Sequence, residues 1–144
     1  MTTVAFRDGI LAWDSQWTDE ESGFKYFNRK GWKDEKAGAI VCGAGSVEVA
    51  FEVLRGIFTD DPQEIRRHKS EDLDLVVLWN DGRLEVYDEY GRCVPFDTSY
   101  FYAWGSGAKP ALAAMHMGAT AAGAVAVAAK VDLYTGGPIH EESW

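Results

Sequence analysis

The chain has 144 residues and a formal net charge of −9, which fit one compact, acidic domain spanning residues 1–144. Hydrophobic residues make up 47% of the sequence, so the chain can bury a core and is not disordered. The acidic residues are spread along it and leave no basic patch, so we expect no nucleic acid and no membrane among its partners.

Strand-like runs open the sequence. Residues 2–7 and 10–15 flank Asp8-Gly9, a pair that favours a tight hairpin turn. After a polar loop, the pattern predicts a second pair of strands at residues 24–30 and 37–43, which are joined by a turn at residues 33–36.

An apolar face with helical spacing begins at Ser46. Apolar residues recur every three or four positions as far as Phe58, which predicts an amphipathic helix. The Ser46 hydroxyl can accept a hydrogen bond from a first-turn amide, and Asp60-Asp61-Pro62 stops the helix.

Strands are predicted again in the second half, at residues 73–79, 83–87 and 100–104. Asn80-Asp81-Gly82 is the turn between the first two of them.

Two helices rich in alanine and glycine follow these strands. The first runs from Gly105-Ser106-Gly107 through Met117, and the second from Ala119 to about Lys130. After Gly136-Gly137-Pro138 we expect a polar tail. Strands and helices grouped in this way predict an α+β fold rather than an alternating βαβ array.

The cysteines and histidines do not suggest a metal site. Cys42 and Cys93 are too far apart for a disulfide framework, and the three histidines do not cluster with them at ligand spacing. We therefore expect no metal and no cofactor. The N-terminus has no secretory pattern, and polar residues interrupt the apolar stretch at 108–131, so the expected location is cytoplasmic.

Thr2 is the candidate nucleophile. Removal of Met1 before a small residue would expose the α-amine of Thr2, and such an amine has an ordinary pKa of about 7.7–8.0. One residue can then supply both a nucleophilic hydroxyl and the base that activates it. Many proteins begin with Met-Thr, so this pattern gains weight only from the rest of the chain.

Three segments in order carry a resemblance to a known family. The chain opens with MTTVAFRDGILAWDSQ, which resembles the start of proteasome β-subunits and of the bacterial HslV peptidase. A middle segment, GAIVCGAGSVEVAF, looks like the strand, glycine turn and helix junction of that family. The closest match is AWGSGAKPALAAMHMGATAAGAVAVAAKVDLYTGG, with Gly-Ser-Gly, two helices and Asp-x-x-Thr-Gly-Gly.

The resemblance implies a four-layer αββα sandwich of the N-terminal nucleophile hydrolases, and it covers about half of the chain. A chain this compact is compatible with a bacterial or phage member. The family's catalytic pair would be Asp14 and a buried lysine, for which Lys30 is the first candidate and Lys33 the second. The resemblance makes Thr2 Oγ the attacking atom and its own amine the base.

The remaining roles implied by the resemblance fall on the later blocks. The backbone N–H of Gly45 would stabilise the oxyanion, and Ser106, Asp132 and Thr135 would surround and orient the α-amine. Each of these residues also has an ordinary structural interpretation, such as Ser106 as a helix N-cap. Trp104, beside Ser106, stands where the family has a small residue and could narrow the site.

Three functions are compatible with the sequence. The first is a threonine peptidase subunit in a homo-oligomeric ring, acting on peptide or unfolded protein and fed by an ATP-dependent unfoldase. The second is a catalytically inactive proteasome-like shell or assembly protein. The third is a monomeric small-molecule amidase that uses the same nucleophile.

Overall fold

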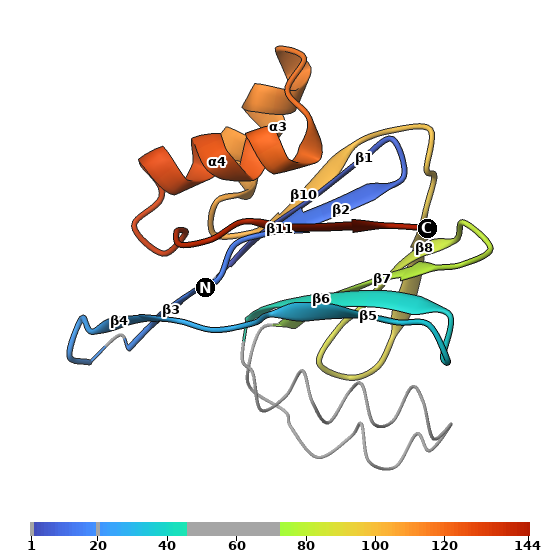
Figure 1. Ribbon diagram of the computed structural model, residues 1–144, viewed down its shortest axis with the longest axis horizontal. Helices are drawn as coiled ribbons and strands as arrows, with labels where there is room; N and C mark the ends of the chain where they lie inside the picture. The colour runs from blue at the N-terminus through green and yellow to red at the C-terminus, as the bar shows by residue number, and fades with distance from the viewer. Residues whose placement is uncertain (1, 20, 46–72) are drawn as a thin grey trace.

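The computed structural model describes residues 2–19, 21–45 and 73–144 (Figure 1). The strands are β1 (Thr3–Arg7), β2 (Ile10–Trp13), β3 (Gln16–Thr18), β4 (Lys25–Phe27), β5 (Gly31–Asp34), β6 (Ala39–Gly45), β7 (Leu73–Trp79), β8 (Leu84–Tyr87), β9 (Cys93–Phe96), β10 (Tyr102–Gly105) and β11 (His140–Ser143). The helices are α3 (Ala108–His116) and α4 (Ala121–Val131).

The described strands form two sheets and a separate ribbon. One sheet has the order β10-β1-β2-β11, the other has the order β5-β6-β7-β8-β9, and β3 pairs with β4 alone. Every pair among these strands is antiparallel. Figure 1 shows the two sheets stacked face to face, with α3 and α4 on the outer side of the first sheet.

The hairpin predicted at Asp8-Gly9 is confirmed. Arg7 pairs with Ile10, which leaves a two-residue loop between β1 and β2. Asp8 and Gly9 both have positive φ, 52° and 77°, as the hairpin turn with the twist of its strands requires. The turn sets the register that brings the start of β1 beside the end of β2.

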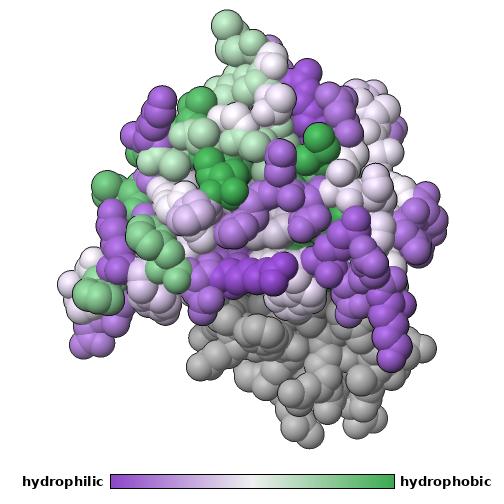
Figure 2. Space-filling model, viewed as in Figure 1, coloured by the Kyte–Doolittle hydropathy of each residue, from purple (hydrophilic) through white to green (hydrophobic). Residues whose placement is uncertain are grey.

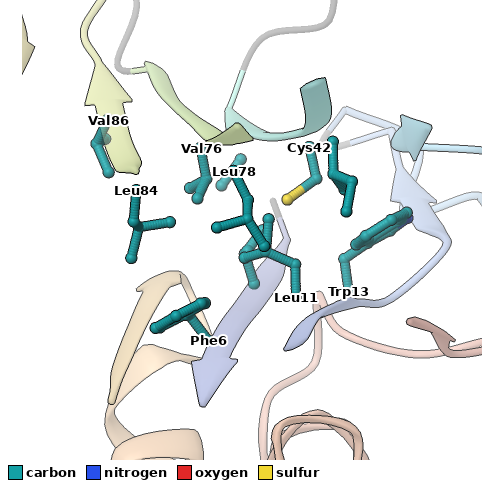
Figure 3. Packing of buried hydrophobic residues seen from close by; sticks show 11 residues of the cluster. Phe6, Leu11, Trp13, Cys42, Val76, Leu78, Leu84 and Val86 are labelled. Atoms are coloured by element: carbon teal, nitrogen blue, oxygen red, sulfur yellow. The ribbon is translucent and has the colours of Figure 1, made fainter. Parts of the chain in front are cut away.

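The space between the two sheets is filled by large apolar side chains. Phe6, Leu11 and Trp13 of the first sheet belong to one cluster with Val76 and Leu84 of the second, and Trp13 lies at the Cys42 end of this cluster (Figure 3). Complete burial of one such side chain stabilises the fold by about 1.5–3 kcal/mol. Trp13 is 1% exposed, so its side chain is part of this packing.

Small residues bring the helices close to the first sheet. Ala5 and Ala12 of the sheet are buried against Ala111, Ala124 and Ala128 of the helices. Alanine carries little bulk, so the backbones can approach each other closely at this interface. The Thr120 side chain caps α4 by accepting a hydrogen bond from the Gly123 amide at 3.1 Å.

The predicted pairing of residues 24–30 with 37–43 is wrong. β4 pairs with β3, whereas β6 pairs with β5, which includes Lys33 and Asp34 that were expected in a turn. The turn lies instead at residues 35–38. A local sequence pattern indicates that a strand exists. Which strand it pairs with depends on tertiary packing, which a local pattern does not show.

The end of the chain, expected to be a polar tail, is part of the first sheet. Residues 140–143 form β11, which pairs with β2 at the edge of that sheet. The side chains there are mostly exposed, so no apolar alternation marks the strand. Trp144 then donates from Nε1 to the Leu78 carbonyl at 3.0 Å and ties this edge to the second sheet.

The α+β class is confirmed, with one helical layer and two sheets described. The predicted helix from Ser46 lies outside the described residues, and the four-layer sandwich stays a prediction. No helix in the described ranges is long and apolar enough to cross a membrane. On the face shown in Figure 2, hydrophilic side chains are interspersed with smaller hydrophobic groups.

Candidate active site

Asp14 and Lys30 form a buried ion pair. Lys30 Nζ donates to Asp14 Oδ1 at 3.0 Å, and the two side chains are 2% and 0% exposed for Lys30 and Asp14 respectively. The ribbon of β3 and β4 lies between Asp14 and Lys30 in the chain. Because its two strands run antiparallel, the chain returns and brings Lys30 next to Asp14, although they are 16 positions apart. The Lys33 ammonium lies elsewhere and contacts the Ser143 carbonyl at 2.8 Å.

Backbone amides complete the surroundings of Asp14. Its Oδ1 also accepts from the Thr3 amide at 3.1 Å. Its Oδ2 accepts from the amides of Gln16 at 3.3 Å and Gly136 at 3.0 Å. These three amides and the Lys30 ammonium together fix the position of the Asp14 carboxyl group.

The Lys30 ammonium is held in a low-dielectric position. Burial lowers the pKa of Lys30 below its ordinary value, and the neighbouring Asp14 and Asp132 carboxylates oppose this without reversing it. The same Nζ lies 5.7 Å from the centroid of the Trp17 ring. Lys30 is thus a cation that gives up its proton more readily than an exposed lysine.

A second group of hydroxyls surrounds Asp132. Its Oδ2 accepts from Ser106 Oγ at 2.5 Å and from Thr135 Oγ1 at 2.6 Å. Burial raises the pKa of this carboxyl, but the hydrogen bonds from Ser106 and Thr135 outweigh it and leave the pKa below its usual value. Asp132 is therefore ionised at neutral pH. Ser106 is not the N-cap of α3, because that position is Gly107.

The turn that carries Asp132 is fastened to the segment that carries Asp14. Ser15 donates from its amide to the Gly136 carbonyl at 3.1 Å and from Oγ to the Pro138 carbonyl at 2.7 Å. Gln16 Nε2 donates to the Leu133 carbonyl at 2.8 Å. These bonds hold the two carboxylates in one site.

Thr2 lies at the start of the first sheet and is 3% exposed. Gly105 faces its backbone so closely that a Cβ there would overlap the Thr2 carbonyl. The φ of Gly105 is +93°, which a glycine adopts without strain. The backbone of the predicted nucleophile therefore packs directly against Gly105, and the Ala44 methyl group would lie 3.3 Å from a Cβ at that glycine.

Thr3 joins the two groups, and the sequence reasoning missed it. Its amide contacts Asp14, and its Oγ1 lies 2.6 Å from Thr135 Oγ1. The signal was the second threonine of the Thr-Thr pair, which opens a strand that continues with the apolar residues Val4, Ala5 and Phe6. Gln16 was missed too, because nothing in its local pattern shows that its amide reaches the turn at Leu133.

The remaining residues lie on the second sheet or in the core. Gly45 ends β6 with a φ of 118°, beside Ala44. Its role as an oxyanion donor stays a prediction. Trp104 packs edge-on against Phe96, 5.5 Å between ring centroids, at the margin of the core between the sheets.

Comparison with known proteins gives matches to solved structures alone. No protein-family model and no curated protein sequence matches the chain. HslV from Trypanosoma brucei matches with a TM-score of 0.71 and 18% identity, over 98% of this chain and 97% of that one. BPH from Thiobacillus denitrificans matches with a TM-score of 0.70 and 18% identity, over 98% and 95%. Its complex with epoxomicin matches with a TM-score of 0.70 and 19% identity, over 98% and 96%.

The likeness extends over nearly the whole of each chain, while the sequences have diverged widely. Such a match establishes the backbone architecture. The chain therefore has the fold of HslV and BPH, as its resemblance to the N-terminal nucleophile hydrolases predicted.

Proposed function

We propose that the chain is a threonine-type endopeptidase subunit that hydrolyses peptide bonds with Thr2 as its nucleophile after Met1 has been removed. The observation that carries the proposal is the buried Asp14–Lys30 pair, which is hydrogen-bonded to the residue next to Thr2. An ion pair of this kind is costly to bury and does not serve packing. Its place beside the threonine that removal of Met1 would expose supports a chemical role for it.

The proposed reaction needs no other nucleophile or base. Thr2 Oγ attacks the carbonyl carbon while its proton passes to the α-amine, and an acyl ester forms when the leaving amine takes that proton. Water then hydrolyses the ester with the same amine as base. The Lys30 ammonium favours the deprotonated forms of nearby groups, and the Gly45 N–H would receive the oxyanion.

The fold and the surface support a wider assignment. We propose a single domain over residues 1–144, a cytoplasmic location and assembly into a homo-oligomeric ring that acts on peptides or unfolded proteins. Several large apolar side chains are exposed and suit contacts between subunits: Phe24 at 67%, Phe27 at 60%, Val131 at 69% and Leu133 at 74%. An ATP-dependent unfoldase remains the proposed partner by analogy with the family.

Intact mass spectrometry combined with a hydrolysis assay tests this proposal. The purified protein should have lost Met1 and should release the fluorophore from a fluorogenic peptide. Epoxomicin, which is bound to BPH in a solved complex, should add the mass of one molecule per subunit and stop the release. Active protein that retains Met1 would contradict the mechanism, because its Thr2 nitrogen would be an amide.

The pH dependence of hydrolysis should have two limbs. We expect kcat/KM to rise with pH through a midpoint at or below about 7.8, as the α-amine loses its proton beside the Lys30 cation. At high pH the rate should fall with a midpoint below 10.5, because burial lowers the pKa of Lys30 and the cation is lost. Initial rates in constant-ionic-strength buffers from pH 5 to about 10.5 measure both limbs. A rate that stays flat between pH 6 and about 9 would argue against an amine base.

A further inference from the structure

Thr3 is the point at which the two groups of the site meet. Its side chain is fully buried, and its backbone pairs with Gly105 in the first sheet. Its amide donates to Asp14 Oδ1, and its hydroxyl contacts Thr135. Among the described residues, Thr3 alone is hydrogen-bonded both to the Asp14–Lys30 pair and to one of the hydroxyls around Asp132.

The direction of each hydroxyl bond can be assigned. A threonine hydroxyl has one proton, and that of Thr135 is donated to the Asp132 carboxylate at 2.6 Å. Thr135 Oγ1 must then accept in its contact with Thr3, also 2.6 Å long, so the Thr3 hydroxyl is the donor. The bonds run from Thr3 through Thr135 to Asp132.

Gly107 makes room for this contact. A Cβ at this position would overlap Thr3 Oγ1 and would come within 3.0 Å of Thr135 Oγ1. The φ of Gly107 is −90°, which any residue can adopt, so its backbone conformation does not call for glycine. Glycine is therefore needed here because the two hydroxyls occupy the space that a side chain would fill.

We propose that Thr3 is a positioning residue for the nucleophile, and that it acts through the hydrogen bond of its hydroxyl to Thr135. This inference rests on the proposed function, because it concerns the same site. It adds to the role that the sequence suggested for Thr135. Thr135 also acts on the nucleophile through Thr3, since its proton is donated to Asp132 and one of its two acceptor lone pairs receives the Thr3 hydroxyl.

The consequence for catalysis is confined to the chemical step. The segment from Thr2 into β1 is held at the amide of Thr3 by Asp14 and at its hydroxyl by Thr135. Loss of the hydrogen bond between the Thr3 and Thr135 hydroxyls leaves the backbone pairing of β1 in place. It allows Thr2 Oγ to move away from the direction in which it attacks the carbonyl carbon. Small displacements of a reacting atom lower kcat, whereas substrate binding elsewhere is unaffected.

Thr3→Val and Thr3→Ser form the matched test. Valine keeps the shape and the β-branch but removes the donor, so kcat per active site should fall on the order of tenfold, with KM within about twofold. Serine keeps the donor and should retain kcat within about threefold of wild type. Active sites are counted by epoxomicin incorporation, so that a loss of folded protein is not read as a lower rate.

Gly107→Ala is a second way to disrupt the contact between the Thr3 and Thr135 hydroxyls. It should lower kcat with KM preserved, like Thr3→Val, because the new methyl group separates the hydroxyls. Gly123→Ala is its control, since the added Cβ would meet the Thr120 hydroxyl at 3.1 Å and the Ala119 methyl at 3.7 Å, away from the site.

The outcomes separate the inference from the function on which it rests. A wild-type kcat per active site in Thr3→Val overturns the inference and leaves the peptidase proposal standing. An equal loss in Thr3→Ser and Thr3→Val also overturns it, because the hydroxyl would then be irrelevant. Wild-type protein without any Thr2-dependent hydrolysis overturns the proposed function, and the inference falls with it.

Discussion

Thr2→Ala is expected to lower peptide hydrolysis by about 10⁴-fold or more, in line with the loss of a catalytic nucleophile in other hydrolases. Alanine lacks the attacking oxygen but keeps the α-amine, and it is small enough for Met1 to be removed as before. The variant should fold, because the contact with Gly105 involves the Thr2 backbone carbonyl rather than its side chain. Fluorogenic peptide hydrolysis and the thermal midpoint of both proteins measure the two effects.

Thr2→Ser is the control for this substitution. Serine keeps both the oxygen and the amine, so most of the chemistry should remain, with a loss of about tenfold from the missing methyl group that orients the side chain. Epoxomicin should add its mass to the serine variant and not to Thr2→Ala. Hydrolysis by Thr2→Ala at the wild-type rate would point to a different nucleophile, whereas a wild-type protein without hydrolysis would favour the inactive shell.

The parts of the fold that the sequence predicts are those fixed by local chemistry. Asp8-Gly9 and Asn80-Asp81-Gly82 specify their turns within a few residues, and both hairpins are present. The helix predicted from Ala119 to about Lys130 is present as α4, at Ala121–Val131. The partner of a strand cannot be predicted in this way, because strand pairing depends on the whole sheet. For this reason β4 was assigned to the wrong neighbour, and the polar strand β11 was not predicted.

The candidate site shows the same division. Asp14 and Asp132 were identified from motifs that resemble a family, without reference to distance. The resemblance ranked Lys30 above Lys33, but the contact of Lys30 with Asp14 could not be derived from the chain, because the ribbon of β3 and β4 sets how far the backbone travels before it returns. Thr3 was missed because its importance comes from contacts on both sides, with Asp14 and with Thr135, which lies 132 positions away.

Lys30→Met tests what the buried ion pair contributes. The substitution keeps an apolar stem but leaves Asp14, which is 0% exposed, as a buried carboxylate without its cation. We expect the free energy of unfolding to fall by about 3–5 kcal/mol, as it does when one partner of a buried pair is removed. Hydrolysis should fall by about 10²–10³-fold in the folded fraction, because an electrostatic contribution next to the nucleophile is lost.

Lys33→Met is the matched control. It removes the same charge from the same strand region, but among the described residues the Lys33 ammonium contacts the Ser143 carbonyl and the Trp144 ring, away from Asp14. Its cost should be below about 1 kcal/mol, with hydrolysis close to wild type. Chemical denaturation and initial rates, measured side by side, give the comparison.

The double variant Asp14→Asn/Lys30→Met separates stability from catalysis. With both charges gone, no uncompensated ion is buried, so part of the stability lost in Lys30→Met should return. In the wild type the amides of Gln16 and Gly136 donate to Asp14 Oδ2 and the amide of Thr3 donates to Oδ1, so an asparagine oxygen at the Oδ2 position keeps two of these three hydrogen bonds. Hydrolysis should not return with stability, because the cation that favours a neutral α-amine is still missing. Recovery of both together would mean that the ion pair serves the fold alone, and that Thr2 is not activated by Lys30.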